Sequence, residues 1–148
     1  MNYEFVPMNL EYVKKIEKWK YNGFLKEIYV KPYFDNYDKD SKVLKGPGGC
    51  DGFAVLNQDK LIGLFEYYFK EEIMEIGLAI SPDIVGEGYG EEFVRKGIEF
   101  GINNYDYKKE YIQLSVNIKN KPAIRVYEKA GFVHHNNEED SIEMRKYL

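Results

Sequence analysis

The chain has 148 residues, of which 44% are hydrophobic and 31% charged, so it is long enough for one domain and is not disordered. Its 21 basic and 25 acidic residues give a net charge of −4, which argues against nucleic acid as a partner. A single cysteine, Cys50, favours a reducing, cytoplasmic location. The N-terminus does not resemble a signal peptide, and no stretch approaches the ~20 apolar residues of a membrane span, so no membrane partner is expected. We therefore interpret residues 1–148 as a single domain.

The first third of the chain predicts one strand and one clear helix. Tyr3–Pro7 alternates weakly, as a strand does. Asn9 is a suitable N-cap for a helix over Leu10–Lys20, which the pair Asn22-Gly23 ends. Between Phe24 and Asp51 the pattern is weak: it predicts a loop at residues 46–49 and a short helix before it.

The remaining two thirds alternate between strands and helices. The predicted strands are Gly52–Leu56, Leu61–Phe69, Ile73–Ile80, Tyr111–Val116, Phe132–His135 and Ser141–Tyr147; the predicted helices begin near Gly90 and at Asn120, the latter running to Ala130. Hairpins mixed with strand-helix-strand crossovers indicate an α/β fold. We expect a mixed, mostly antiparallel sheet of about seven strands with helices on both faces.

Aromatic residues make up 16% of the chain, and several gather early. The early group is Trp19, Tyr21, Phe24, Tyr29, Tyr33, Phe34 and Tyr37. Two interpretations stay open: ordinary core and sheet surface, or the wall of a binding site.

Three alternate glycines, Gly86, Gly88 and Gly90, separate a strand from an amphipathic helix. The start of a helix carries unpaired N–H groups and partial positive charge, and glycines allow a phosphate to approach the backbone. The alternative is merely a sharp turn. Neither the dinucleotide fingerprint nor the P-loop fits, because Glu91 stands where the fingerprint needs its last glycine and no Gly-Lys-Ser/Thr string exists.

A second segment begins thirty residues later with Asn120, a suitable N-cap, and ends with Gly131. Helical spacing places Ala123, Val126, Tyr127 and Ala130 on one face. Taken alone, Tyr127 is best explained as a core aromatic.

Together the two segments resemble the GNAT superfamily of acyl-CoA-dependent N-acetyltransferases. The first matches the Arg/Gln-x-x-Gly-x-Gly/Ala motif in its glycines, although Val85 replaces the first residue. The second matches Asn-x-x-Ala-x-x-x-Tyr-x-x-x-Gly-Phe at every specified position, from Asn120 to Phe132. The resemblance covers roughly residues 52–132, and the predicted strand order is also similar to that of the family.

The resemblance implies a site for acetyl-CoA as co-substrate and no resident metal. It implies backbone contacts of pantetheine with Leu78, Ala79 and Ile80, a pyrophosphate cradle over Val85, Gly86, Glu87, Gly88, Tyr89, Gly90 and Glu91, and contacts from Asn120 and Tyr127. Replacing the usual Arg or Gln by Val85 removes a side-chain donor but no backbone N–H. Glu87, Glu91 and Glu92 are expected to point outward, because they would repel phosphates.

The implied reaction is direct attack of a primary amine on the thioester in a ternary complex. Tyr127 would donate a hydrogen bond to the leaving thiolate, since a phenol (pKa about 10) is a weaker acid than a thiol (pKa about 8.5). Glu75 is the first candidate for the general base, because it shares a strand face with Gly77 and Ala79, and Glu66 is the second. A solvated strand carboxylate is the alternative for each. His134 and His135 are expected at the surface.

The acceptor is expected to be a small-molecule or peptide amine. Trp19, Tyr21 and Glu66 are the candidate residues for binding it, and the family often forms homodimers, so a homodimer is a further expectation. Two other functions stay open: a non-catalytic acyl-CoA-binding module, and a nucleotide-binding domain that prefers ATP or NAD.

Overall fold

The computed structural model describes residues 1–23 and 27–148; Phe24, one of the early aromatic residues, lies outside this part. The strands are β1 (Glu4–Pro7), β2 (Asp51–Asn57), β3 (Lys60–Lys70), β4 (Ile73–Ile80), β5 (Tyr111–Asn117), β6 (Val133–Asn137) and β7 (Ser141–Tyr147). The helices are α1 (Leu10–Glu17), α2 (Lys31–Asp35), α3 (Gly90–Tyr105) and α4 (Lys121–Lys129), with a 3₁₀ turn at Pro47–Gly49.

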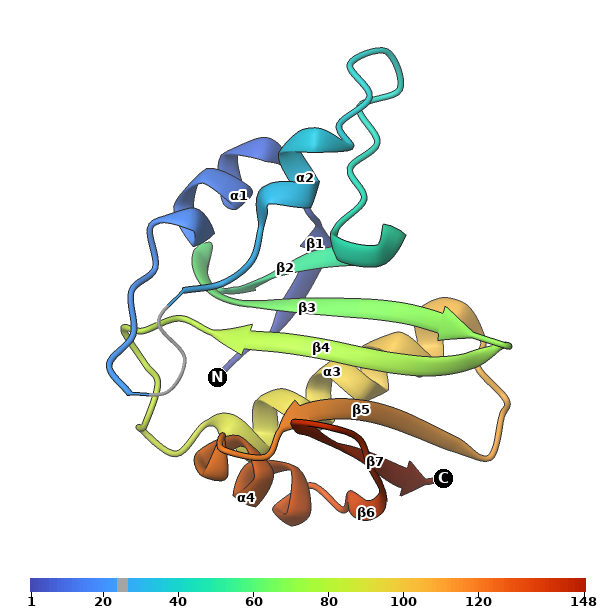
Figure 1. The fold of residues 1–148 in the computed structure, drawn as a ribbon. Coiled ribbons are helices and arrows are strands. Elements are labelled where there is room, and N and C mark those ends of the chain that lie inside the picture. Colours follow the sequence, from blue (N-terminus) through green and yellow to red (C-terminus); the bar gives the residue numbers. More distant parts are fainter. Residues whose placement is uncertain (24–26) are drawn as a thin grey trace.

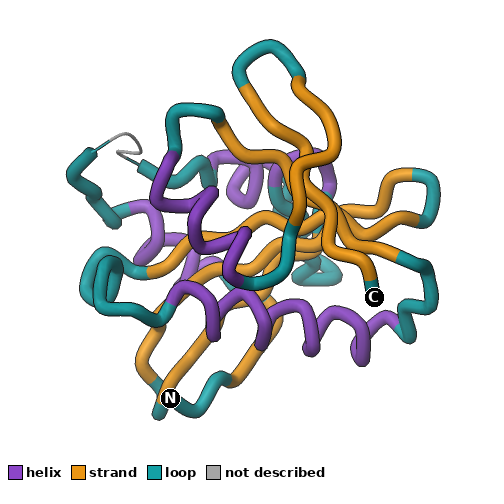
Figure 2. The backbone as a smooth tube through the Cα atoms, turned by 90° about the horizontal axis from the view of Figure 1, so that it is seen from below, coloured by secondary structure: helices purple, strands orange, loops and turns teal. Residues whose placement is uncertain are grey.

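The strands form one seven-stranded sheet in the order β1-β2-β3-β4-β5-β7-β6. All neighbours are antiparallel except β4 and β5, which are parallel. Helices α1 and α2 cover one face of the sheet, and α3 and α4 lie on the other (Figure 1; Figure 2 shows the molecule from below). The predicted mixed sheet with helices on both faces is therefore confirmed.

Glycines bring α3 unusually close to the sheet. A Cβ at Gly97 would overlap the Phe65 ring on β3, and one at Gly101 would lie 2.5 Å from the Tyr67 ring. The Tyr67 hydroxyl donates a hydrogen bond of 2.6 Å to the Gly97 carbonyl oxygen. Aromatic rings of β3 thus fill the space that side chains at Gly97 and Gly101 would need.

The structure differs from the sequence prediction in the first third of the chain. Helix α1 ends at Glu17 rather than at Lys20, because the Lys18 N–H bonds back to Lys15 and Ile16 and closes the last turn. The segment at residues 46–49 is a tight 3₁₀ turn with Gly48 at a φ of 65°, so the predicted loop is ordered. The short helix expected before it is α2, which carries a proline in its first turn.

Replacing Gly97 by Ala tests the contact between α3 and β3. Overpacking against Phe65 costs about 1–3 kcal/mol, and the better helix propensity of Ala returns ~1 kcal/mol. The free energy of unfolding should therefore fall by up to about 2 kcal/mol. Urea denaturation measures the change. Glu99→Ala, on the exposed side of the same helix, is the control; equal stability of both variants would contradict the packing described here.

Candidate active site

The site is organised around the place where β4 and β5 separate. Their parallel pairing has a single registered pair, Glu75 with Gln113, near the start of both strands. The Gln113 side-chain amide donates to Glu75 Oε1 over 3.2 Å, and Lys70 Nζ lies 3.2 Å from Glu75 Oε2. Beyond this vertex, Leu78, Ala79 and Ile80 have no registered partner on β5. The later part of β4 therefore has one backbone edge without ladder hydrogen bonds to β5.

The glycine turn lies immediately after this edge. Gly86 and Gly88 have φ values of +82° and +91°, and a Cβ on either would meet no atom within 4 Å. Both residues thus adopt the left-handed backbone that glycine tolerates best, next to open space. Within residues 1–23 and 27–148, no protein acceptor takes the N–H groups of Gly86, Gly88, Gly90 or Glu91, and α3 has no side-chain N-cap. Free N–H groups of this kind suit an anionic oxygen-rich ligand.

The third alternate glycine has a different role. A Cβ on Gly90 would lie 2.9 Å from Cγ2 of Val126, so Gly90 allows the start of α3 to contact α4. Val126 is followed directly by Tyr127, which is partly buried and contacts Phe132 edge-on with a ring distance of 6.1 Å. Burial raises the pKa of the Tyr127 phenol to about 12, so the phenol stays protonated and remains a donor well above neutral pH.

Val85 directly precedes the glycine turn, and Asn120 directly precedes α4. Asn120 caps α4 by accepting the Ala123 N–H at 3.4 Å through Oδ1, as expected, which leaves its Nδ2 donor for a ligand. Val85 is 52% exposed in the turn before Gly86. It supplies no polar group, so any binding there depends on the backbone.

The acidic residues of the turn do not point at the free N–H groups. Glu87 is exposed, and Glu91 forms an ion pair with Arg95 one helical turn later, at 2.7 Å. Glu92 lies 3.9 Å from the N-terminal amino group of Met1. These arrangements reduce the repulsion that a phosphate would meet.

A buried carboxylate, Glu66 on β3, lies on the opposite face of the sheet and is only 9% exposed. It pairs across the sheet with Gly77, and its Oε1 would lie 3.4 Å from a Cβ at Gly77. The Tyr33 hydroxyl of α2 donates to Glu66 Oε2 over 2.5 Å. Burial raises the pKa of the Glu66 carboxyl, and hydrogen bonds from Tyr33 and Cys50 oppose that rise.

The contacts of Glu66 with Tyr33 and Cys50 were not predicted from the sequence. The available signal was glycine: a Cβ at Gly52 would overlap the Tyr33 hydroxyl, and one at Gly46 would lie 2.5 Å from the Tyr33 ring. Both glycines were visible in the sequence, but only the fold shows which side chain needs the space.

Of the candidate acceptor residues, Tyr21 lies at the end of β4, where its hydroxyl donates to the Ile80 carbonyl oxygen over 2.6 Å. Burial raises the pKa of this phenol too. Trp19 packs against the core beneath α1 and α2 but is only partly buried. The early aromatic group is therefore divided: Tyr33 is fully buried, Tyr29 is exposed, and Tyr21 reaches the candidate site.

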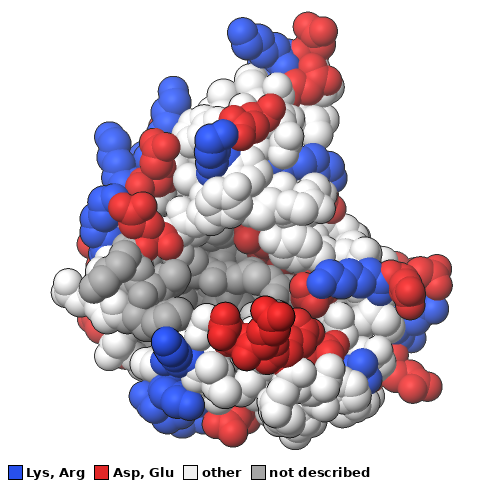
Figure 3. Space-filling view, in the orientation of Figure 1, with Lys and Arg blue, Asp and Glu red and all other residues white. Residues whose placement is uncertain are grey.

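The face drawn in Figure 3 is hollowed across its middle, and acidic side chains gather below the hollow. His134 and His135 are exposed on the edge strand β6, as expected. Cavities of about 450 and 480 Å³ beside Phe100 and Tyr107 contain none of the candidate site residues.

In the described ranges no group of three or more His, Cys, Asp or Glu side chains is placed to hold a metal ion. None of the helices in those ranges has the length and apolar character needed to cross a membrane.

The unpaired edge of β4, the glycine turn and the contact between α3 and α4 belong to one α/β domain. The domain family described as "Acetyltransferase (GNAT) domain" matches residues 9–133. The chain therefore belongs to the GNAT acetyltransferase family.

Individual relatives are more distant. The chain is 25% identical over 109 residues to spermidine N(1)-acetyltransferase of Vibrio cholerae serotype O1; the match covers 74% of the chain and 57% of that relative's length. A crystal structure of Vibrio cholerae spermidine N-acetyltransferase with CoA and spermine has a TM-score of 0.72 at 18% identity, covering 98% of this chain and 95% of that one. The structure of the Campylobacter jejuni N-acetyltransferase PseH in complex with acetyl coenzyme A has a TM-score of 0.70 at 15% identity, and the match covers 99% of both chains.

Replacing Glu66 by Gln tests the raised pKa of this carboxyl. Between the unfolded-state pKa of about 4.3 and the higher folded-state pKa, the unfolded chain has released a proton that the folded chain keeps. Wild-type stability should therefore fall with rising pH over this interval, while the variant lacks this decline. Urea denaturation of both proteins from pH 4 to 8 measures the difference, with exposed Glu99→Gln as control. A difference independent of pH would contradict the prediction.

Proposed function

We propose that this protein transfers the acetyl group of acetyl-CoA to a primary amine, by direct attack of the amine on the thioester in a ternary complex. The observation that carries the proposal is the row of free N–H groups at the glycine turn, next to the unpaired edge of β4, in a GNAT family chain. A relative named as a spermidine N-acetyltransferase, and similar structures that contain CoA or acetyl coenzyme A, support it.

The residues present fit acetyl-CoA. The backbone of Leu78, Ala79 and Ile80 would pair with pantetheine, and the turn would hold the pyrophosphate through Val85, Gly86, Glu87, Gly88, Tyr89, Gly90 and Glu91. Asn120 would contribute its Nδ2 donor. Because a turn without Arg or Gln depends on backbone N–H groups alone, we expect weaker affinity than a cationic side chain would provide.

Tyr127 would donate a hydrogen bond to the sulfur of the leaving CoA thiolate. With its pKa near 12 against about 8.5 for a thiol, complete proton transfer to the thiolate is uphill by roughly 5 kcal/mol. Tyr127 therefore stabilises the developing thiolate by a hydrogen bond, and solvent supplies the proton later. An N–H at the end of β4, near Ile80, would stabilise the oxyanion of the tetrahedral intermediate.

Two carboxylates are available to take the proton of the ammonium group. Glu75, the first candidate, is held by Lys70 and Gln113 at the vertex of β4 and β5. Glu66 has one oxygen facing Gly77, one residue before the proposed pantetheine contacts. Removing each in turn separates their roles.

The acceptor is a small-molecule or peptide amine, and the acidic side chains beside the hollow in Figure 3 favour a cationic one. Spermidine and spermine belong in the test panel, because a relative acts on spermidine. Trp19 and Tyr21, on the loop after α1, and Glu66 are the proposed acceptor contacts. A cytoplasmic location and a homodimer are part of this proposal.

Release of free thiol from acetyl-CoA, measured across polyamines, amino acids and peptide N-termini, tests the activity. Acetylated product must accompany the thiol. Thermal stabilisation by acetyl-CoA without thiol release for any amine would favour a non-catalytic acyl-CoA-binding module instead. Stabilisation by ATP or NAD in preference to CoA would favour a nucleotide-binding domain.

Tyr127→Phe tests the proposed hydrogen bond to sulfur. Because the bond forms mainly as negative charge develops, kcat should fall by about 10²-fold while KM for acetyl-CoA stays nearly unchanged. Tyr147→Phe is the control, since Tyr147 is 58% exposed at the C-terminal end of β7. An unchanged kcat in the Tyr127 variant would remove this role.

A further inference from the structure

A buried polar cluster joins α2 to the middle of the sheet, and the proposed chemistry has so far used only its carboxylate, Glu66, and not its other members. Its centre is the bond of 2.5 Å from the Tyr33 hydroxyl to Glu66 Oε2. Tyr33 is completely buried, and Glu66 is 9% exposed. The Tyr33 hydroxyl in such a position needs a protein partner, because water reaches the pair only through the exposed part of Glu66.

The backbone around Tyr33 is arranged to admit its ring. Gly46 and Gly52 lie where any side chain would overlap the ring or hydroxyl of Tyr33. The Tyr33 N–H bonds to the Val30 carbonyl, which fixes the start of α2. Tyr33 is therefore held at both its backbone N–H and its hydroxyl, which fixes the direction of the side chain toward Glu66.

The two oxygens of Glu66 have different surroundings. Oε2 accepts the Tyr33 bond, whereas Oε1 lies over Gly77 of β4. Gly77 directly precedes Leu78, Ala79 and Ile80, the proposed pantetheine contacts. Because Gly77 has no side chain, Oε1 faces the strand that would hold the thioester.

From these contacts we propose that Glu66 accepts the proton of the acceptor amine and that Tyr33 is its positioning residue. Tyr33 orients the carboxylate through Oε2 and stabilises its charged form, which leaves Oε1 to take the proton. This inference rests on the proposed function. It assigns the base to Glu66 and leaves Glu75 to hold β4 to β5.

Every proton that moves in the proposed acetyl transfer has a donor and an acceptor. The ammonium form of the acceptor gives one proton to Glu66, and the neutral amine attacks the acetyl carbon, forming the C–N bond. The C–S bond then breaks, the thiolate leaves with its electron pair, and the proton still carried by the amide nitrogen goes through solvent to the thiolate. Glu66 releases its proton to solvent, so each turnover yields the amide, CoA thiol and one proton.

Burial and hydrogen bonding act on Glu66 in opposite directions. Burial raises the pKa of the carboxyl, and the Tyr33 and Cys50 hydrogen bonds lower it. Within the described residues, Tyr68 of β3 also interacts electrostatically with Glu66. On β4, Gly77 is the direct partner of Glu66, and Glu75 lies two residues away on the same face, while β2 presents Gly52. Without the Tyr33 hydroxyl the carboxyl should hold its proton to higher pH.

Tyr33→Phe, assayed as kcat/KM against pH with acetyl-CoA and the best amine of the panel, tests the proposal. The acidic limb, which is the rise of kcat/KM with pH as Glu66 loses its proton, should move to higher pH by about one unit. At pH 7, kcat should fall about tenfold while KM for acetyl-CoA stays nearly constant. Glu66→Gln should abolish the limb and most of the activity, whereas Glu75→Gln should keep the limb. An unmoved limb in Tyr33→Phe, or a limb that persists in Glu66→Gln, overturns the proposal.

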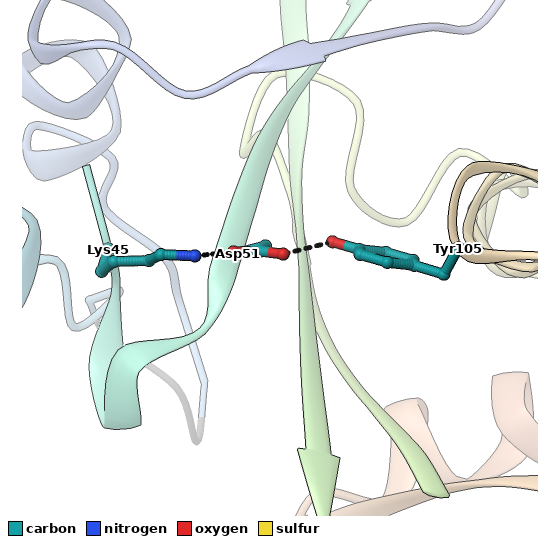
Figure 4. Close-up of polar contacts among 3 residues, drawn as sticks. All are labelled: Lys45, Asp51 and Tyr105. Atoms are coloured by element: carbon teal, nitrogen blue, oxygen red, sulfur yellow. Dashed lines mark hydrogen bonds and ion pairs between the residues drawn. The ribbon is translucent and has the colours of Figure 1, made fainter. Parts of the chain in front are cut away.

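Tyr105→Phe is the matched control. The Tyr105 hydroxyl of α3 also donates to a carboxylate, Asp51, at 2.6 Å, and Asp51 is further paired with Lys45 (Figure 4). This variant loses the same type of bond outside the proposed chemistry. Its Tm should change while the acidic limb stays in place; a shift equal to that of Tyr33→Phe would overturn the specific role of Tyr33.

A second measurement does not depend on activity. The stability difference between the wild-type protein and the Glu66→Gln variant levels off near the folded-state pKa of Glu66, and the Tyr33→Phe background should move that point to higher pH. No movement overturns the positioning role even if no amine is acetylated, in which case the proposed function fails separately. Should Tyr33→Phe not fold, Glu66→Asp, which withdraws the carboxylate from Tyr33, gives the same comparison.

Discussion

The separation of β4 from β5 is the constraint on which the rest of this structure depends. In a fully paired sheet, the backbone groups of both strands would be satisfied by each other. Here a single registered pair, Glu75 with Gln113, joins the strands, and the later residues of β4 lack partners on β5. A strand edge left open within a sheet is suited to an extended ligand such as pantetheine, which pairs with backbone groups.

The helices on one face make use of the same opening. The glycine turn that follows β4 exposes N–H groups at the start of α3, and Gly90 lets Val126 of α4 approach at close range. Tyr127, the next residue of α4, is thereby held in place by the packing of α4 against the start of α3. In the proposed function, phosphate binding and the position of the phenol would both depend on this contact between helices.

On the other face of the sheet, α2 holds the carboxylate of Glu66 in place. The Tyr33 side chain packs against the sheet where Gly46 and Gly52 leave space, and its hydroxyl donates a hydrogen bond to Glu66. The sheet therefore separates two kinds of chemistry: backbone donors and a phenol on the side of α3 and α4, and a buried acid with its donor on the side of α2. Glu66 lies against Gly77 of β4, and the glycine turn follows the end of the same strand, so β4 connects the two groups.

Local patterns determined a large part of this protein. The strands, the caps at Asn9 and Asn120, and the glycines before α3 all follow from residues within a few positions of one another, and such short-range chemistry is written in the order of the chain. Only the tertiary structure decided that Tyr33 would meet Glu66 and that Glu75 would meet Gln113, 33 and 38 residues apart. Periodicity gives the face on which a side chain lies; it does not give the partner that packing brings to that face.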